Sequence, residues 1–477
     1  MTTTTLFKKS ILSAAILSTA SLTASLAQAM PAAVTNGNDT GAGSLRAALE
    51  AGARDIVIAT DQDIMITSPL VYSGTLPLSI IGTGQTVMTL DHITLLTVSE
   101  GANLTVVGVN FAGPGGYDIN NQAPEGQAGK GIFVDVRDDQ TGTVKLVLKD
   151  VTVSGVANHG VHVSDCDLAD DCGGGGGGAG AGSAAQIVVE LDNVTIDGVG
   201  LGKFDADGMR VDERGEGNIF FTASNSTFKN VGADGVELDE GQAGGVRATV
   251  SNSSFADNGS YCDPAQLEGE LEAFLAGAPD EAEFDESEQI AEATLPGPVA
   301  GSSDDGCFEY EVDTYDSGFV EAYEYAIDVD DGFDIDEAGE GSLNATVVSS
   351  TITDNLDEGI DFDEEDNGAI NVVFVGTTAT GNTDDGFKMS EEGGAGVRGL
   401  VTGSEASNNG GKGFVFEEAD DGGVVVEVYG TSTSNNDDSD DTGIEAVQED
   451  AGSGKLTVSD STIEDGIDLD GVDLIEN

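Results

Sequence analysis

Charged side chains recur at one fixed place along this chain. The second residue after a recurrent glycine is, in six successive copies, His162, Arg210, Glu237, Asp334, Asp361 and Lys388. The fourth residue after that glycine is acidic in four of them, Asp212, Asp239, Asp336 and Asp363. Carboxylate oxygens on a rigid surface suit Ca²⁺, and a cationic or imidazole side chain beside them can move a proton. The pattern therefore favours cation binding, with acid–base groups alongside.

These residues recur because the chain repeats itself. The steps from Gly208 to Gly235, from Gly332 to Gly359 and from Gly359 to Gly386 are each 27 residues. Each copy holds short runs in which apolar and polar residues alternate, separated by Gly, Asn and Asp, with no helical period. Such runs predict an all-β solenoid, a right-handed parallel β-helix with coils of ~27 residues, stacked about 4.8 Å apart.

Alternation decides which face each residue takes. In "DEGIDFDEEDNG", residues 357–368, Ile360 and Phe362 are expected to point inward and Asp361 and Asp363 outward. Stacked coils then place like charges about 4.8 Å apart, and such a pair repels by about 3.5 kcal/mol at an effective dielectric of 20. Raised carboxylate pKa values, salt screening or bound divalent cations would each relieve this repulsion, and the sequence leaves all three open. In the later copies the carboxylates expected to hold metal are Asp334, Asp336, Asp361 and Asp363.

The composition restricts the partners and the location. The net charge is −71 at pH 7, which rules out simple electrostatic binding to nucleic acid or to anionic lipid. Residues 1–29 have the features of an export signal, with Lys8 and Lys9 before an apolar run and Ala27-Gln28-Ala29 at its end. No later run is long and apolar enough to span a bilayer. We therefore expect an exported protein, secreted or periplasmic, without a membrane span.

Two stretches interrupt the period. A glycine-rich loop, residues 166–185, separates two coils, and an insertion at residues 260–326 includes "DPAQLEGELEAFLAGA", a predicted helix starting at Asp263 and Pro264. Both leave the stack near Arg210 and could wall a groove there. The expected division is 30–60 (cap and first strand), 61–259 (β-helix), 260–326 (insertion) and 327–477 (β-helix continued).

The four cysteines lie in these interruptions. In an exported protein the simplest pairing is Cys166 with Cys172 and Cys262 with Cys307. Zinc is the weaker alternative because the spacings are irregular and the chain has only 3 histidines.

The first repeats carry a family resemblance. "TGAGSLRAALEAG", residues 40–52, predicts a short amphipathic helix with Ser44 as its N-cap, which would cover the open end of the stack. Together with "NHGVHV", "DGMRV" and "DGVEL", it resembles secreted right-handed parallel β-helix proteins of the pectin-lyase-like superfamily. The resemblance covers nearly the whole exported chain and implies the fold. It leaves the activity open, since lyases, hydrolases, adhesins and phage spikes share this architecture.

The same resemblance suggests roles for single residues. Pectate-lyase-like enzymes hold Ca²⁺ on acidic residues of such a face, and an Arg or Lys removes the proton next to the uronate carboxyl group. By that resemblance Arg210 is the candidate base, with His162 beside it, and Glu237 and Lys388 would bind substrate. The calcium ligands that the resemblance implies are Asp207, Asp212, Asp234 and Asp239. The competing interpretation is that Arg210 and Lys388 are counter-charges that relieve the acidic rows.

We therefore expect a protein that binds divalent cations, with Ca²⁺ the expected ion, and an extracellular or cell-surface polysaccharide or matrix. One alternative is a Ca²⁺-dependent polyuronate lyase. The other is a salt-adapted structural or adhesive protein without a specific site.

Overall fold

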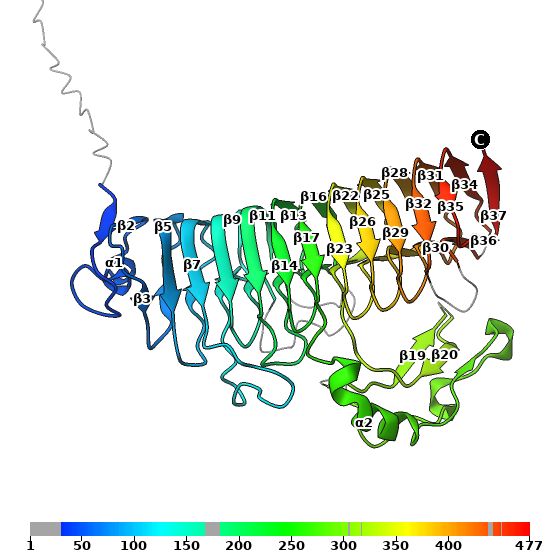
Figure 1. Cartoon of the computed structure of the whole chain (residues 1–477), viewed down its shortest axis with the longest axis horizontal. Coiled ribbons are helices and arrows are strands. Elements are labelled where there is room, and N and C mark those ends of the chain that lie inside the picture. The colour runs from blue at the N-terminus through cyan, green and yellow to red at the C-terminus, as the bar shows by residue number, and fades with distance from the viewer. Residues whose placement is uncertain (1–29, 167–181, 304–305, 316, 437–441, 450) are drawn as a thin grey trace, which may run out of the picture.

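The computed structural model describes residues 30–166, 182–303, 306–315, 317–436, 442–449 and 451–477. Most of these residues wind into a long stack of coils, a parallel β-helix, with a separate lobe on one side (Figure 1). The predicted all-β parallel β-helix is confirmed. The predicted export signal, most of the loop at 166–185 and the Cys166–Cys172 bond depend on residues outside the described ranges.

A twelve-stranded parallel sheet forms one wall of the stack. Its strands are β4 (Leu70–Tyr72), β6 (Leu96–Val98), β8 (Ile132–Asp135), β10 (Val161–Ser164), β12 (Met209–Glu213), β15 (Val236–Glu240), β21 (Phe333–Gly339), β24 (Ile360–Asp366), β27 (Lys388–Gly393), β30 (Phe414–Glu418), β33 (Ile444–Gln448) and β36 (Ile467–Asp470). We call it the acidic sheet, because it carries the charged positions described above.

A 22-stranded sheet forms the rest of the wall. Its strands are β1 (Ala32–Val34), β2 (Asp55–Ile58), β3 (Ile64–Met65), β5 (Leu78–Met88), β7 (Leu104–Ala112), β9 (Thr141–Ser154), β11 (Ala184–Asp197), β13 (Ile219–Ser224), β14 (Thr227–Lys229), β16 (Val246–Ser251), β17 (Ser254–Ala256), β22 (Asn344–Val348), β23 (Thr351–Thr353), β25 (Asn371–Val375), β26 (Thr378–Thr380), β28 (Arg398–Thr402), β29 (Glu405–Ser407), β31 (Val425–Tyr429), β32 (Ser432–Ser434), β34 (Gly454–Ser459), β35 (Thr462–Ile463) and β37 (Val472–Glu476).

The core lies between the two sheets. Inward side chains of the acidic sheet such as Val211, Leu238, Ile335 and Phe362 are fully buried, as the alternation predicts. The ring of Phe333 stacks on that of Phe255 at a centroid distance of 5.4 Å, so that apolar contacts run along the stack as well as across each coil. Continuous burial of this kind is what holds a solenoid together.

A short helix lies at one end of the stack. Helix α1 (Leu45–Glu50) lies at the N-terminal end of the coils (Figure 1). The Ser44 side chain accepts a hydrogen bond from the backbone of Ala47, and Leu45 and Leu49 are buried. The helix is present as predicted, and its role as a cap stays a prediction. No helix of the described residues is long and apolar enough to cross a membrane.

The insertion forms the separate lobe (Figure 1). It contains α2 (Pro264–Leu275), two short 3-10 helices (Glu286–Glu288 and Glu292–Thr294) and an antiparallel sheet of β18 (Ala282–Glu283), β20 (Val320–Glu324) and β19 (Glu311–Thr314). Asp263 caps α2 by accepting a hydrogen bond from the backbone of Ala265 at 2.8 Å. The predicted helix is therefore confirmed, and so is the Cys262–Cys307 disulfide.

Candidate functional site

The acidic sheet aligns the predicted charged residues in neighbouring coils. The strand register pairs them in the order His162, Arg210, Glu237, Asp334, Asp361 and Lys388. The second row runs in the order Asp212, Asp239, Asp336 and Asp363. Side chains that are far apart in the sequence therefore form two straight rows along the stack.

Arg210 is surrounded by carboxylates. Its Nε lies 2.7 Å from Asp212 Oδ1, one Nη contacts Glu237, and the side chains of Asp205 and Asp207 are each 3.5 Å away. Burial alone would lower the pKa of Arg210, but Glu237 and then Asp212 hold this pKa well above its ordinary value. A base has to give up its proton before it can act. The geometry therefore favours Arg210 as a fixed positive charge that balances its neighbours.

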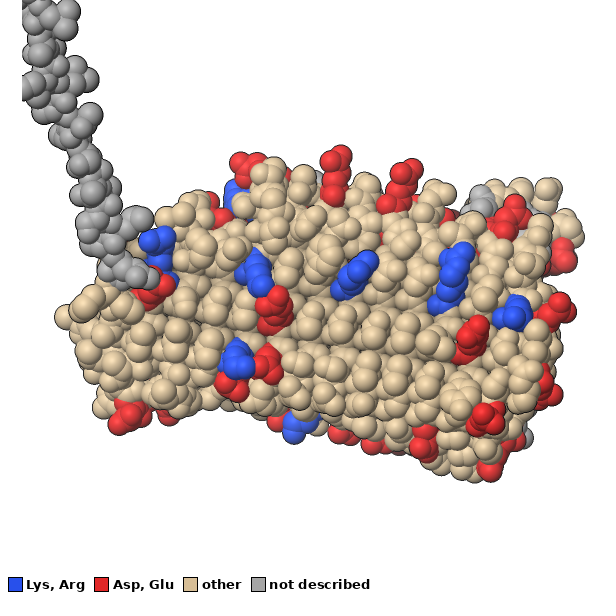
Figure 2. Space-filling view, turned by 90° about the horizontal axis from the view of Figure 1, so that it is seen from above, with Lys and Arg blue, Asp and Glu red and all other residues tan. Residues whose placement is uncertain are grey.

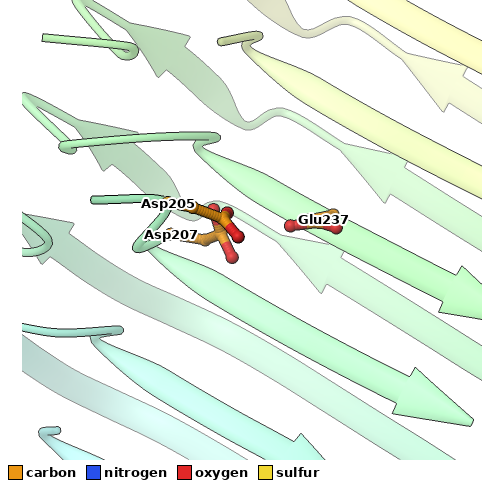
Figure 3. A group of neighbouring side chains, drawn as sticks. All are labelled: Asp205, Asp207 and Glu237. Carbon is orange, nitrogen blue, oxygen red and sulfur yellow. The ribbon is translucent and has the colours of Figure 1, made fainter. Parts of the chain in front are cut away.

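A first three-carboxylate group lies around this arginine. Asp205 and Asp207, from the turn before β12, point toward Glu237 on β15 (Figure 3). One oxygen of each can lie within 4.8 Å of the others, so that the three could hold a metal ion. Burial, opposed by Arg210, raises the pKa of Asp207 to about 6. We call these three residues the upstream group.

A second group lies further along the same face. Asp331, Glu358 and Asp361 also bring three carboxylate oxygens within 4.8 Å of one another, and all three residues are buried. Lys388 Nζ is 2.7 Å from Asp361 Oδ2 and 3.3 Å from Glu358 Oε1. Asp331 Oδ1 and Asp361 Oδ1 are buried without a hydrogen-bond partner. We call Asp331, Glu358 and Asp361 the downstream group, and its unpaired oxygens suit a cation.

The other expected metal ligands have different surroundings. Asp212 and Asp239 pair with protein cations, and Asp234 accepts a hydrogen bond from the backbone of Asp331 at 2.6 Å. Asp334 and Asp336 form a further three-carboxylate group with Glu237, whereas Asp363 is in none of the groups found among the described residues. Asp357, Glu358 and Asp384 form another such group. The sequence pattern assigned no metal to five carboxylates of these groups, which are Asp205, Asp331, Asp357, Glu358 and Asp384.

A third feature joins Lys130, His162 and Asp212. Lys130 Nζ contacts His162 Nδ1, and His162 Nε2 is 2.6 Å from Asp212 Oδ2. Burial lowers the pKa of Lys130 to about 7, and burial together with Lys130 lowers the pKa of His162 to about 4. Near neutrality His162 is therefore uncharged and Lys130 gains and loses its proton. The sequence did not single out Lys130, although Lys130 precedes Gly131 just as Asp207 precedes Gly208.

A groove of about 530 Å³ runs between the insertion and the coils. Leu271 and Leu275 line it from α2, and Asp357 and Asp384 line it from the coils beside the downstream group. The face seen from above in Figure 2 is different, because most of it is uncharged and Lys, Arg, Asp and Glu side chains lie at intervals among the other residues. The acidic sheet beside the insertion is therefore the distinctive surface.

Comparison with known proteins finds similar solved structures at low sequence identity. No protein-family model and no curated protein sequence matches the chain. Solved structures similar to it include pectate lyase Pel9A, with 14% identity over 93% of this chain and 79% of that one and a TM-score of 0.38. A second is the A-module of the Azotobacter vinelandii mannuronan C-5 epimerase AlgE6, with 9% identity over 93% and 96% and a TM-score of 0.42.

A third is the enzymatically active domain of the bacteriophage CBA120 tailspike protein 2, with 12% identity over 89% of this chain and 47% of that one and a TM-score of 0.43. These are parallel β-helix proteins. At such low similarity none of them assigns a reaction to this chain, and the fold itself rests on the strand register.

Proposed function

We propose that the acidic sheet binds an acidic extracellular polysaccharide through bound divalent cations, with Ca²⁺ the expected ion. The observation that carries the proposal is that two three-carboxylate groups, each beside a protein cation, recur in register on one face. The upstream group lies at Arg210 and the downstream group at Lys388. Strands β12 and β24 are three coil steps apart, which is roughly 14 Å at about 4.8 Å per step.

Charge explains why cations are needed. A chain of net charge −71 repels a polyanion unless cations lie between them. Ca²⁺ takes six to eight oxygen ligands, so that a three-carboxylate group leaves room for an oxygen of a sugar carboxylate. Repetition along the stack suits a linear polymer, and the groove beside the insertion offers it a wall. The predicted export signal and the Cys262–Cys307 disulfide support a secreted or periplasmic location, because disulfides persist in oxidising compartments.

Retention on immobilised polygalacturonate and alginate tests this proposal. At high, fixed monovalent salt we expect Ca²⁺-dependent retention that a chelator abolishes. The variant Glu358→Gln/Asp361→Asn removes two carboxylates of the downstream group and should weaken retention. The control Glu405→Gln/Glu427→Gln removes two exposed charges from the 22-stranded sheet and should not. No retention on either polymer, with or without Ca²⁺, would leave a salt-adapted structural protein as the better account.

A second function is favoured by Lys130. A general base works best when its pKa lies near the operating pH, and that of Lys130 is about 7. In a polyuronate lyase the Lys130 amine would take the proton next to the uronate carboxyl group. The released electron pair would form a carbon–carbon double bond as the bond to the glycosidic oxygen breaks, and this oxygen would gain a proton from water. His162, held by Asp212, would orient the amine. A cation at the upstream group would stabilise the negative charge that develops on the substrate carboxylate.

The assay for this second function is unsaturated product on pectate or alginate, followed by its ultraviolet absorbance. Absence of product from a broad polyuronide panel would exclude the lyase while leaving cation-dependent binding testable on its own.

A further inference from the structure

A third row of carboxylates lies inside the coils. The fifth residue after the recurrent glycine is a glutamate in six neighbouring strands of the acidic sheet, and the register pairs them in the order Glu213, Glu240, Glu337, Glu364, Glu391 and Glu418. Each of the six is at most 1% exposed. Since the first and third residues after the glycine point inward, the fifth does so too. The row runs along the inner corner where each coil leaves the acidic sheet.

The last two members of this row have hydrogen-bond donors. Glu391 Oε2 accepts a hydrogen bond from the backbone of Gly396 at 2.9 Å, and Glu418 Oε1 accepts one from the backbone of Gly422 at 2.9 Å. The first four, Glu213, Glu240, Glu337 and Glu364, have both carboxylate oxygens buried without a hydrogen-bond partner. We call these four residues the inner glutamates.

Burying a carboxylate without a hydrogen-bond donor costs free energy of folding. A buried carboxylate without a partner loses its hydration and gains nothing in return. Among the described residues, no lysine, arginine or histidine lies within 4.0 Å of an inner glutamate. The contacts of these four carboxyl groups include one another and neighbouring carboxyl groups, so that the row must share either protons or a bound cation.

Backbone oxygens converge on the same corner. A Cβ at Gly341 would collide with both Glu337 Oε1 and the carbonyl oxygen of Gly244 in the coil before. A Cβ at Gly368 would likewise collide with Glu364 Oε1 and the carbonyl oxygen of Gly341. The glycine four residues after each inner glutamate thus lets a carbonyl oxygen and a carboxylate oxygen approach each other. Carboxylate and carbonyl oxygens that lie close together form the environment that a hard cation prefers.

We propose that the inner glutamates bind two divalent cations of the Ca²⁺ class, one between Glu213 and Glu240 and one between Glu337 and Glu364. Two such ions balance four carboxylates. Two glutamates supply up to four oxygens to each ion, and the turn carbonyls supply more, toward the six to eight that Ca²⁺ takes. These ions are structural and separate from the outer groups, so that the proposal does not depend on polysaccharide binding.

Protons are the alternative occupant. Burial and contact with neighbouring carboxyl groups raise the pKa of Glu240 and of Glu364 to about 10, so that without a cation the row would hold protons. A cation must displace those protons, and binding should therefore release protons and weaken at low pH.

The calcium content of the protein shows whether the inner glutamates hold divalent cations or protons. The protein is refolded in Ca²⁺, dialysed against chelator in high monovalent salt, and analysed for calcium per chain. We expect two retained ions in the native protein and at least one fewer in Glu337→Gln/Glu364→Gln, together with a lower melting temperature in Ca²⁺. The matched control Glu365→Gln/Asp366→Asn neutralises two exposed residues that follow Glu364 on β24, and it should retain both ions.

If Glu337→Gln/Glu364→Gln does not fold, the native protein still tests the proposal. Refolding of the native protein in chelator should fail or should yield a form with a lower melting temperature. Native protein without retained calcium would overturn the proposal in favour of protons. So would an inner variant that keeps as much calcium as the native protein.

Discussion

Lys130 Nζ contacts Nδ1 of His162. His162 lies on β10, between β8 and the strand β12 that carries Arg210. Lys130 and Arg210, the basic residues on the two sides of His162, differ in the direction in which their surroundings shift the pKa. The pKa of Lys130 is lowered to about 7 by burial, whereas that of Arg210 is held high by Glu237 and Asp212 against the effect of burial. We therefore propose Lys130 as the group that would transfer a proton at neutral pH, and Arg210 as the counter-charge of the surrounding carboxylates.

Replacing Lys130 tests this assignment. If the protein cleaves a polyuronide, Lys130→Met should lower kcat/KM by about 10²–10⁴-fold, the usual contribution of a general base. Retention on the polymer should persist, because the upstream and downstream groups are intact. The rising limb of the native pH–rate profile should lie near the pKa of Lys130. As a control, Lys145→Met removes an exposed lysine paired with Glu190 and should leave activity unchanged. Full activity in Lys130→Met, with loss in Arg210→Lys, would return the role to Arg210.

Removing Arg210 should destabilise the native protein. Five carboxylates approach its guanidinium, from Asp205, Asp207, Asp212, Glu237 and Asp239. Arg210→Ala leaves them without a counter-charge, and loss of one partner of a buried ion pair typically costs about 3–5 kcal/mol. Denaturant unfolding measures the change. Arg398→Ala, at an exposed site on the 22-stranded sheet, should change the free energy of unfolding by no more than about 0.5 kcal/mol. Equal effects in the two variants would show that Arg210 does not balance this cluster.

The pH dependence of stability follows from the raised carboxyl pKa values. Burial, the largest cause, raises the pKa of Asp207 to about 6, of Asp239 to about 7 and of Glu213 to about 8. In the unfolded chain these groups titrate near about 4. The folded protein then binds more protons, so its stability is greatest below about pH 4 for these groups and is lost as pH rises toward 8. The pKa of His162 is lowered to about 4. Between about pH 4 and 6.5 this group therefore makes the folded protein more stable as the pH rises, opposite to the effect of the carboxyl groups.

Carboxyl groups with a raised pKa outnumber groups with a lowered pKa such as His162. We therefore expect the melting temperature in chelator to fall between pH 5 and pH 8, and we expect Ca²⁺ to reduce that fall. Calorimetry across this range provides the measurement. A melting temperature in chelator that rises over the same range would contradict the burial of these carboxyl groups.

A single methyl group tests the inner corner. Gly341→Ala places a Cβ against Glu337 Oε1 and the Gly244 carbonyl oxygen, and overpacking of this kind usually costs about 1–3 kcal/mol. Gly394 provides the matched control, because an added Cβ there meets no atom within 4 Å. Thermal unfolding should show a lower melting temperature for Gly341→Ala only. Equal melting of both variants would mean that the corner is looser than these contacts require.

The sequence predicted the two outer rows of charged residues because a repeat of 27 residues acts together with a two-residue alternation of inward and outward side chains. They place Ile360 and Phe362 in the core and Asp361 and Asp363 outside. The same alternation continues to Glu364, although a charged residue is not expected inside the core. Its recurrence with a glycine four residues later was the available signal.

Other site residues were beyond the reach of the pattern. Lys130 precedes Gly131, which stands 29 residues before Gly160, so that strict periodicity misses it. Asp205 lies in a turn, where the period does not specify the direction of a side chain. Its approach to Glu237 could be recognised only once the coils were stacked.

A calorimetric titration with Ca²⁺ in high monovalent salt tests the central claim most directly, because salt removes the diffuse ion atmosphere and leaves specific sites. The account predicts a saturable heat with a small whole number of ions per chain, reduced in Glu358→Gln/Asp361→Asn and unchanged in Glu405→Gln/Glu427→Gln. A weak heat that never saturates and is the same in all three proteins would contradict the account.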